Sequence, residues 1–509
     1  MHNVCLIVVD GFGVAPAGPG NARTLANIPT IHTLEKQTPS VIMNASGNAV
    51  GLPEGQQGAS EPGHLTMGAG RIVWQPLEEI NQSIKQGSFF ENEVLVAACK
   101  RALEKKVPLH LIGLYSTGGV HSSAEHFHAM LQLAKKMGVD HVSLHLFGDG
   151  RDVGEQYFCT DFHLLTEEVS RLQLGTIASL VGRYFAMDRD RQYAERTKIA
   201  YDLLTQGVGR EVADLCVGAK AWYVEAADKE RTDYYIRPLK TPAFQTINSG
   251  DIVLCINFRS DRMIQIVRAL EDENFHEFPR PVRIRDVVCM GPYSDHLPVA
   301  FPATEVKNTL GEIVSKNGLK QLRVAETDKF AHVTFFFNAQ QHEPYPGEDR
   351  LLVESPKVSN FALAPDMSAD ELTKQVIEKI NTKEYAFIVM NYANPDLVGH
   401  GGDLAAVIKG CEAVDRNLAI LLPALEKAGY DWIVTADHGN AEEMYYPGTQ
   451  TISPSHSNNP VQTFVHSTKI TSADQLSECT GLKDIASLVL TLMELPVPAE
   501  MEKKGMEKI

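Results

Sequence analysis

The sequence lacks the features of membrane-spanning, secreted and nucleic-acid-binding proteins. No apolar run in the 509 residues approaches the roughly 20 residues that a membrane-spanning helix needs. The chain begins with an apolar strand pattern and has neither a basic leader segment nor a cleavage site, so we expect no signal peptide and a cytoplasmic protein. The formal net charge of −17 argues against nucleic acid and anionic membranes as partners. An anionic substrate would therefore need a local basic pocket.

Closely spaced cysteines are also missing. The 8 cysteines are scattered along the chain and none belongs to a CxxC pair. Cys5 and Cys255 lie inside apolar strand patterns. We therefore predict buried free thiols in a reducing compartment.

Strand and helix patterns alternate along most of the chain. Helical patterns cover residues 93–106, 126–137, 193–205 and 404–425, and strand patterns cover residues 4–9, 109–115, 141–147, 176–181, 252–258, 282–290, 321–325, 386–390 and 431–434. The apolar segment 332–337 fits either a strand or a buried helix. The alternation predicts an α/β fold with mostly parallel sheets, and the length predicts at least two domains.

Carboxylates and imidazoles follow several of the predicted strands. They are Asp10, Asp396, His400, Asp437, His438 and His456. Parallel strands bind ligands beyond their carboxyl ends, and oxygen and imidazole ligands without thiolates favour Mn²⁺, Mg²⁺ or Zn²⁺. The set predicts a two-metal site, although each residue taken alone is more often an ordinary loop or surface group. Ser60, in a glycine-rich loop, is then a candidate nucleophile, and Lys329 would neutralise charge on a transferring phosphoryl group.

A basic set follows the strands in the middle of the chain. Its members are His121, Arg151, Arg183, Arg189, Arg259 and Arg262. A single surface arginine is usually solvated or paired with a carboxylate. A whole set placed just beyond strand ends predicts an anion pocket, because arginine grips phosphate and carboxylate with two hydrogen bonds.

The metal-ligating candidates come from both ends of the chain, so the two ends must fold together. We predict a discontinuous metal-binding domain from residues 1–75 and 308–509, with an inserted substrate-binding domain from residues 76–307. Long insertions are tolerated because the entropy cost of loop closure grows slowly with length.

The motifs resemble those of the cofactor-independent phosphoglycerate mutases of the alkaline phosphatase superfamily. They include VVDGFG at 8–13, GASEPGHLTMGAGR at 58–71, STGGVHS at 116–122, GDGRD at 148–152, GRYFAMDRD at 182–190, FRSDR at 258–262, AETDK at 325–329, ANPDLVGH at 393–400, TADHGN at 435–440 and SHSNNP at 455–460. They run in the family's order over nearly the whole chain. TADHGN alone would indicate only the superfamily.

The resemblance implies a role for each candidate residue. One metal would be held by Asp396, His400 and His456, and the other by Asp10, Ser60, Asp437 and His438. Ser60 would become phosphorylated and Lys329 would stabilise the transferring group. The phosphoglycerate would be bound by His121, Arg151, Asp152, Arg183, Arg189, Arg259, Arg262 and Lys329, with Asp152 the candidate general acid and base.

The implied reaction is a glycolytic isomerisation. 3-Phosphoglycerate and 2-phosphoglycerate would interconvert through a phosphoserine at two divalent ions, with no bisphosphoglycerate required. By analogy the ions would be Mn²⁺, while Mg²⁺, Zn²⁺ and Co²⁺ also suit the ligands. We expect a monomer whose domains close over the substrate to keep water out.

Three positions depart from the family pattern, and two other functions compete. Pro62, Thr117 and Ser260 differ from the usual residues, and none of them is a metal ligand. The first competitor is another enzyme of the superfamily, such as a phosphohydrolase or a phosphopentomutase. The inserted arginines argue against a plain hydrolase, which has no need to retain glycerate. The second is a metal-stabilised protein that binds an anionic metabolite without turnover.

Overall fold

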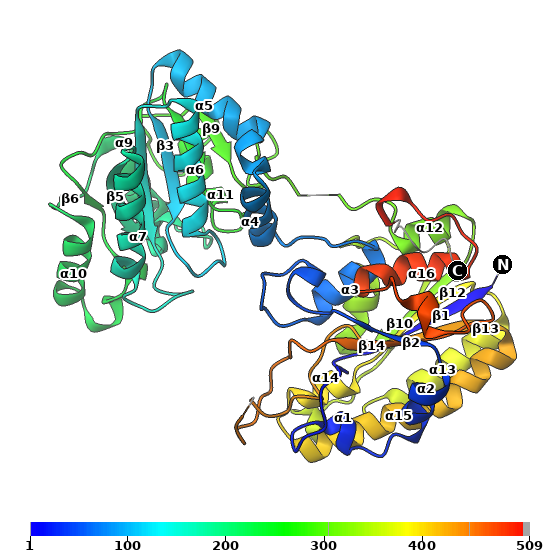
Figure 1. The fold of residues 1–509 in the computed structure, drawn as a ribbon. Helices are drawn as coiled ribbons and strands as arrows, with labels where there is room; N and C mark the ends of the chain where they lie inside the picture. Colours follow the sequence, from blue (N-terminus) through cyan, green and yellow to red (C-terminus); the bar gives the residue numbers. More distant parts are fainter. Residues whose placement is uncertain (1, 304, 447, 502–509) are drawn as a thin grey trace. The chain divides into compact units, whose positions relative to one another are not determined.

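The computed structural model describes residues 2–303, 305–446 and 448–501. The chain divides into two compact units (Figure 1). The first unit comprises Met1–Gln75 and Glu305–Ile509, and the second comprises Pro76–Thr304. The first unit is therefore discontinuous in sequence.

A seven-stranded sheet forms the centre of the described part of the first unit, in the order β11-β10-β12-β1-β13-β14-β2. The strands are β1 (Asn3–Val9), β2 (Ser40–Met43), β10 (Gln321–Glu326), β11 (Glu348–Val353), β12 (Phe387–Tyr392), β13 (Tyr430–Thr435) and β14 (Val461–His466). Among these strands only β14 runs in the direction opposite to the other six. The central strands are buried on both faces, which explains their continuous apolar sequences.

Helices cover both faces of this sheet (Figure 1). One group, whose members contact one another, is α3 (Ser60–Ala69), α12 (Leu310–Lys316) and α16 (Ile485–Leu492). The other is α1 (Ala22–Leu25), α2 (Pro29–Gln37), α13 (Ala369–Thr382), α14 (Asn394–Gly399) and α15 (Leu404–Ala428). The segment 332–337, whose sequence fits either a strand or a buried helix, contains a helical turn of the π type, His332–Phe336.

The described part of the second unit also has a seven-stranded sheet, in the order β6-β7-β5-β4-β3-β8-β9. Its strands are β3 (Leu109–Leu114), β4 (Val142–Gly148), β5 (Thr176–Gly182), β6 (Arg210–Glu211), β7 (Leu239–Lys240), β8 (Ile252–Cys255) and β9 (Asp286–Cys289). The five strands from β5 to β9 in this order are parallel, and β7 pairs with β5 in the antiparallel sense.

Alternate residues of β3 enter different cores. Leu109 and Leu111 belong to one core, whereas Ile112 and Leu114 belong to the other. The first core includes residues of α5 (Glu93–Lys105), α6 (Ala124–Met137), α7 (Phe158–Leu172) and α10 (Leu215–Glu225); the second includes residues of α8 (Arg183–Ala186), α9 (Lys198–Gln206) and α11 (Ile264–Glu271). Helix α4 (Pro76–Gln86) begins the unit. The two apolar faces make this a sheet between helix layers.

The predicted α/β class with two mostly parallel sheets is confirmed. Some boundaries differ: the strand predicted over residues 282–290 begins only at Asp286, and the helix predicted from Tyr193 starts with a π-type turn. No helix in the described ranges has both the length and the apolar character to cross a bilayer.

The prediction that the cysteines are free thiols is wrong for one pair. Cys159 of α7 and Cys216 of α10 form a disulfide across a sequence separation of 57. The other six cysteines, among them Cys5 and Cys255, are free and buried. The sequence did not predict this disulfide because the spacing of the two cysteines matches no local motif. Only the packing of α7 against α10 brings the two sulfurs together.

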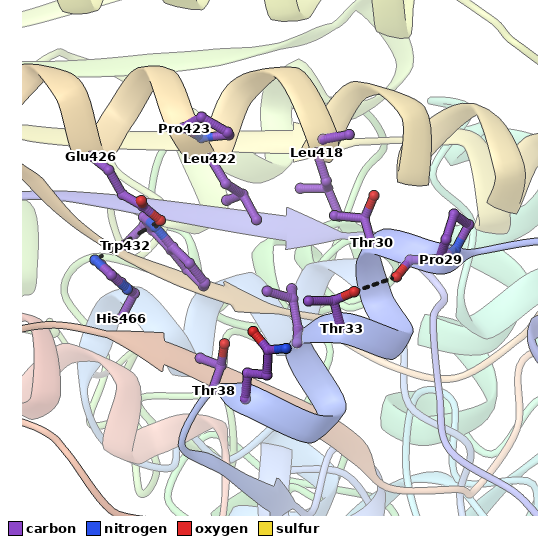
Figure 2. A pocket seen from close by; sticks show the side chains of 13 residues that line it. Pro29, Thr30, Thr33, Thr38, Leu418, Leu422, Pro423, Glu426, Trp432 and His466 are labelled. Carbon is purple, nitrogen blue, oxygen red and sulfur yellow. Dashed lines mark hydrogen bonds and ion pairs between the residues drawn. The ribbon is translucent and has the colours of Figure 1, made fainter.

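A groove of about 550 Å³ lies between α2, α15 and the two strands β13 and β14 (Figure 2). In it the Trp432 indole stacks on His466, with ring centroids 5.0 Å apart, and donates a hydrogen bond to Glu426. Trp432 lies near the amino end of β13, whereas Asp437 and His438 follow its carboxyl end. The groove is thus separate from the predicted metal ligands.

Candidate active site

The first unit gathers its polar residues at one edge of the sheet. Asp10 follows β1, Asp396 lies in the helix after β12, and Asp437 and His438 follow β13. Lys329 closes the turn Thr327–Lys329 after β10. His456 precedes β14, whose antiparallel direction places its amino end beside the carboxyl ends of the others. One sheet edge therefore collects side chains from five strands.

Ser60 is the first residue of α3 and its side chain is buried among charged groups. Its Oγ donates a hydrogen bond to Asp10 Oδ1 at 3.1 Å and lies 3.0 Å from His438 Nε2. Lys329 Nζ donates to this same Oγ at 2.7 Å. A hydroxyl held between a carboxylate and an ammonium group is in a position to act as a nucleophile.

Lys329 also connects the carboxylates. Its ammonium group donates to Asp10 Oδ1 at 2.7 Å and to Asp396 Oδ2 at 2.6 Å. All three side chains are buried. Burial alone would raise the pKa of Asp10, but the charge of Lys329, together with the hydrogen bond and charge of His438, outweighs burial and holds that pKa well below its usual range.

Two groups of side chains meet the geometric requirements of metal ligands. Asp396, His400 and His456 form one group, and Asp10, Asp437 and His438 form the other; in each, the candidate ligand atoms lie within 4.8 Å of one another. His400 and His456 approach Asp396 Oδ1 at 3.4 and 3.2 Å. Asp396 and His400 lie on one helical turn, with the amide of His400 bonded to the carbonyl of Asp396.

The imidazoles are oriented as metal ligands require. The Nδ1 atoms of His400, His456 and His438 lie 2.8, 2.7 and 3.2 Å from backbone carbonyl oxygens, so each ring is set to donate from Nδ1. Each Nε2 then faces the site, and the Nε2 atoms of His400 and His456 are only 3.1 Å apart. Two ring nitrogens this close need a cation between them, either a shared proton or a metal ion.

The net negative charge of the site also calls for cations. Burial would lower the pKa of His438, but Asp437 and Asp10 raise it to about 10. In the described residues the buried Oδ2 of Asp437 accepts no hydrogen bond. These residues therefore fit divalent ions, which would take the place of the proton on His438.

The second unit holds the predicted basic residues around loops that follow its strands. Arg183 is buried and donates to Asp149 Oδ1 at 2.6 Å and to Asp152. Asp149 also accepts hydrogen bonds from the amides of Arg151 and Asp152, at 3.2 and 3.0 Å. Asp149 therefore shapes the loop that presents both residues.

Three of the remaining basic residues surround Asp261. Arg189 and Arg259 approach its carboxylate at 3.0 and 3.1 Å, and His121 Nδ1 lies 3.7 Å away. Burial, followed by the charge of Arg183, lowers the pKa of His121 to about 4, so its ring is neutral at pH 7. Burial and the nearby Arg183 and Arg189 also lower the pKa of Arg262. Such crowding of cations favours an anionic ligand.

Several supporting residues were not predicted from the sequence. His64 contacts the Ser60 carbonyl through Nδ1 at 2.9 Å, and Asn391 donates to Asp10 Oδ2 at 2.7 Å. Asn440 donates to Asp396 Oδ1 at 3.1 Å. The motifs GASEPGH, GDGRD and TADHGN contained His64, Asp149 and Asn440, but only the fold shows what these side chains hold.

Comparisons with known proteins agree on one family. A family profile described as the Metalloenzyme superfamily matches residues 2–497. The chain is 43% identical to a 2,3-bisphosphoglycerate-independent phosphoglycerate mutase of Moorella thermoacetica, over 98% of this chain and 97% of that protein. It is 42% identical to one from Methanosarcina acetivorans, over 98% of each.

A solved structure is also similar. It is the phosphoglycerate mutase of Leishmania mexicana, crystallised at low cobalt concentration. It is 30% identical, with a TM-score of 0.56, over 99% of this chain and 97% of that one.

Proposed function

Because this chain belongs to the 2,3-bisphosphoglycerate-independent phosphoglycerate mutases of the metalloenzyme superfamily, we propose that it interconverts 3-phosphoglycerate and 2-phosphoglycerate by way of a phosphoserine at Ser60. The observation that carries this proposal is the contact of Ser60 Oγ with Asp10, His438 and Lys329. No bisphosphoglycerate takes part.

In the first half-reaction Ser60 Oγ attacks phosphorus and the bond from phosphorus to the C3 oxygen breaks. As this bond forms, the hydroxyl proton passes to Asp10 Oδ1, the carboxylate oxygen to which Ser60 Oγ donates its hydrogen bond. The ammonium group of Lys329 stabilises the negative charge on the transferring phosphoryl group. The leaving C3 oxygen takes a proton from Asp152, the proposed general acid.

In the second half-reaction the C2 hydroxyl of glycerate attacks the phosphoserine, the bond to Ser60 Oγ breaks, and Asp10 returns the proton to this oxygen. Asp152 takes the proton of that hydroxyl, so no net proton is consumed. The basic residues proposed to bind substrate keep the glycerate through its carboxylate; they are His121, Arg151, Arg183, Arg189, Arg259 and Arg262. Retention of glycerate distinguishes a mutase from a hydrolase.

The proposed metal ligands are the two groups described above, with Ser60 joining Asp10, Asp437 and His438. The ions would supply Lewis acidity toward the phosphoryl oxygens and the serine hydroxyl. We propose Mn²⁺ as the metal, since mixed carboxylate and imidazole ligation suits it. We further propose that the protein is cytoplasmic, because phosphoglycerate is a glycolytic intermediate, and that it is a monomer. Light scattering after size-exclusion chromatography tests the monomer.

The assignment is tested with 3-phosphoglycerate and no added bisphosphoglycerate. Chelated protein should be inactive and Mn²⁺ should restore formation of 2-phosphoglycerate. Ser60→Ala should abolish turnover and phosphoenzyme while the variant still binds Mn²⁺. Release of phosphate in place of 2-phosphoglycerate would identify a phosphohydrolase, and binding without turnover in the parent would identify a binding protein. X-ray scattering with and without Mn²⁺ and phosphoglycerate tests the predicted domain closure.

A further inference from the structure

Glu442 is a buried carboxylate that touches three loops and has no part in the mechanism above. Its side chain is 3% exposed. Oε2 accepts hydrogen bonds from the amides of Gly13 at 3.0 Å and Asn440 at 2.9 Å. Oε1 accepts from Asn459 Nδ2 at 3.1 Å and from the hydroxyl of Ser457. The donors lie far apart in sequence, so this carboxylate is a cross-link between loops.

Each of these loops presents candidate metal ligands. The loop of Gly13 begins with Asp10, the loop of Asn440 contains Asp437 and His438, and Ser457 directly follows His456. Asn440 additionally donates its side-chain amide to Asp396. Glu442 is thus connected to both groups of ligands although it belongs to neither.

The backbone leaves room for this carboxylate at two glycines. A Cβ atom added to Gly13 would lie 2.5 Å from the Glu442 carboxyl carbon, and one added to Gly439 would lie 2.2 Å from Oε1. Both distances are shorter than a carbon atom tolerates, so any other residue would displace the carboxylate. The glycines of the DGFG and TADHGN motifs therefore permit the cross-link.

We propose that Glu442 is a positioning residue that holds the loops of the metal ligands in place, which rests on the two-metal site of the proposed function. Asp10, Asp396 and Asp437 repel one another, so the loops that present them need an independent anchor. A carboxylate suits this task because both of its oxygens only accept, and four donors point at them. A glutamine would direct its own N–H groups at donors.

The test is the affinity of the metal-free protein for Mn²⁺, measured by calorimetric titration. Glu442→Gln should bind Mn²⁺ about 10- to 100-fold more weakly than the parent, the usual effect of losing an outer-shell partner. Glu443→Gln is the matched control, because the adjacent Glu443 is half-buried and its side chain, within the part of the chain that the structure describes, accepts a hydrogen bond only from Asn459, at 3.3 Å. Its affinity should equal that of the parent.

The possible results separate the inference from the proposed function. An unchanged affinity in Glu442→Gln overturns the positioning role while the two-metal site stands. Failure of the parent to bind Mn²⁺ overturns the proposed function itself. A lower melting temperature of the metal-free Glu442→Gln variant with unchanged Mn²⁺ affinity would show a purely structural role and also overturns the inference.

A second variant covers the case in which Glu442→Gln does not fold. Ser457→Ala keeps the carboxylate and removes one donor on the loop of His456. It should weaken Mn²⁺ binding about tenfold, as expected for one hydrogen bond to a charged acceptor. Binding as tight as in the parent would contradict the proposed role.

Discussion

Replacing Lys329 with methionine tests the charge balance of the site directly. The ammonium group lies 2.7 Å from Asp10 Oδ1 and 2.6 Å from Asp396 Oδ2, and these carboxylates are 0% and 1% exposed. Methionine has a similar length and no charge. The metal-free variant would therefore keep two buried carboxylates without their ammonium partner.

The expected loss of stability follows from that burial. Breaking a buried ion pair by removing one partner costs about 3–5 kcal/mol. For a unit of this size each kcal/mol lowers the melting temperature by ~2–4 °C, so the transition of the first unit should fall by roughly 6–20 °C. Saturating Mn²⁺ should shrink this difference, because divalent ions neutralise the same carboxylates. Turnover of the Mn²⁺-loaded variant should still fall by roughly 10²- to 10³-fold, since the transferring phosphoryl group loses its ammonium partner.

Differential scanning calorimetry of parent and variant, each with and without Mn²⁺, measures both effects on stability. Lys320→Met is the matched control, because Lys320 pairs with Glu384 at 2.9 Å with both side chains about half exposed. Its melting temperature should hardly change. A decrease for Lys329→Met that is equally large with and without Mn²⁺ would refute the argument, and so would the absence of any decrease in the metal-free protein.

Three further predictions concern Arg183, Glu326 and the disulfide. Arg183→Met leaves Asp149 without its buried cation, so it should lower the stability of the second unit by about 3 kcal/mol. It should also raise the KM for 3-phosphoglycerate. An unchanged KM would exclude Arg183 from substrate binding. Burial raises the pKa of Glu326 from 4.5 to about 7. The folded state therefore binds the Glu326 proton more tightly than the unfolded state does. Up to about 3 kcal/mol of folding stability is then lost as the pH rises from 4.5 through 7. Glu326→Gln should remove this loss of stability with pH. Urea unfolding of the parent and the variant at pH 5 and pH 8 measures their free energies of unfolding. A difference in free energy between parent and variant that is the same at both pH values would contradict the raised pKa of Glu326. Reduction of Cys159–Cys216 frees a 57-residue loop and should lower the melting temperature of the second unit. Thiol titration of the unreduced, unfolded protein should find six free cysteines. A count of eight thiols would contradict the disulfide.

The sequence predicted the fold class because the fold class follows from local patterns of apolar and polar residues. Buried parallel strands such as β1 and β12 are continuous apolar runs, and the helices between them repeat with their own period. Boundaries such as the start of β9 escaped this reasoning. Where a strand begins depends on the neighbour with which it pairs, which is β8 for β9. The apolar residues just before Asp286 pack against the core from a loop, and their sequence pattern does not distinguish such a loop from a strand.

The sequence by itself determined which chemistry is present: the carboxylates, imidazoles and arginines beyond strand ends, and the motifs that indicate the family. Only the tertiary structure decided which groups meet. It places Ser60 Oγ 3.0 Å from His438 Nε2 across 378 positions, links Cys159 to Cys216, and points four donors at Glu442. The physical reason is that hydrogen bonds and ion pairs act over a few ångströms in space, whereas sequence patterns report only on neighbours along the chain.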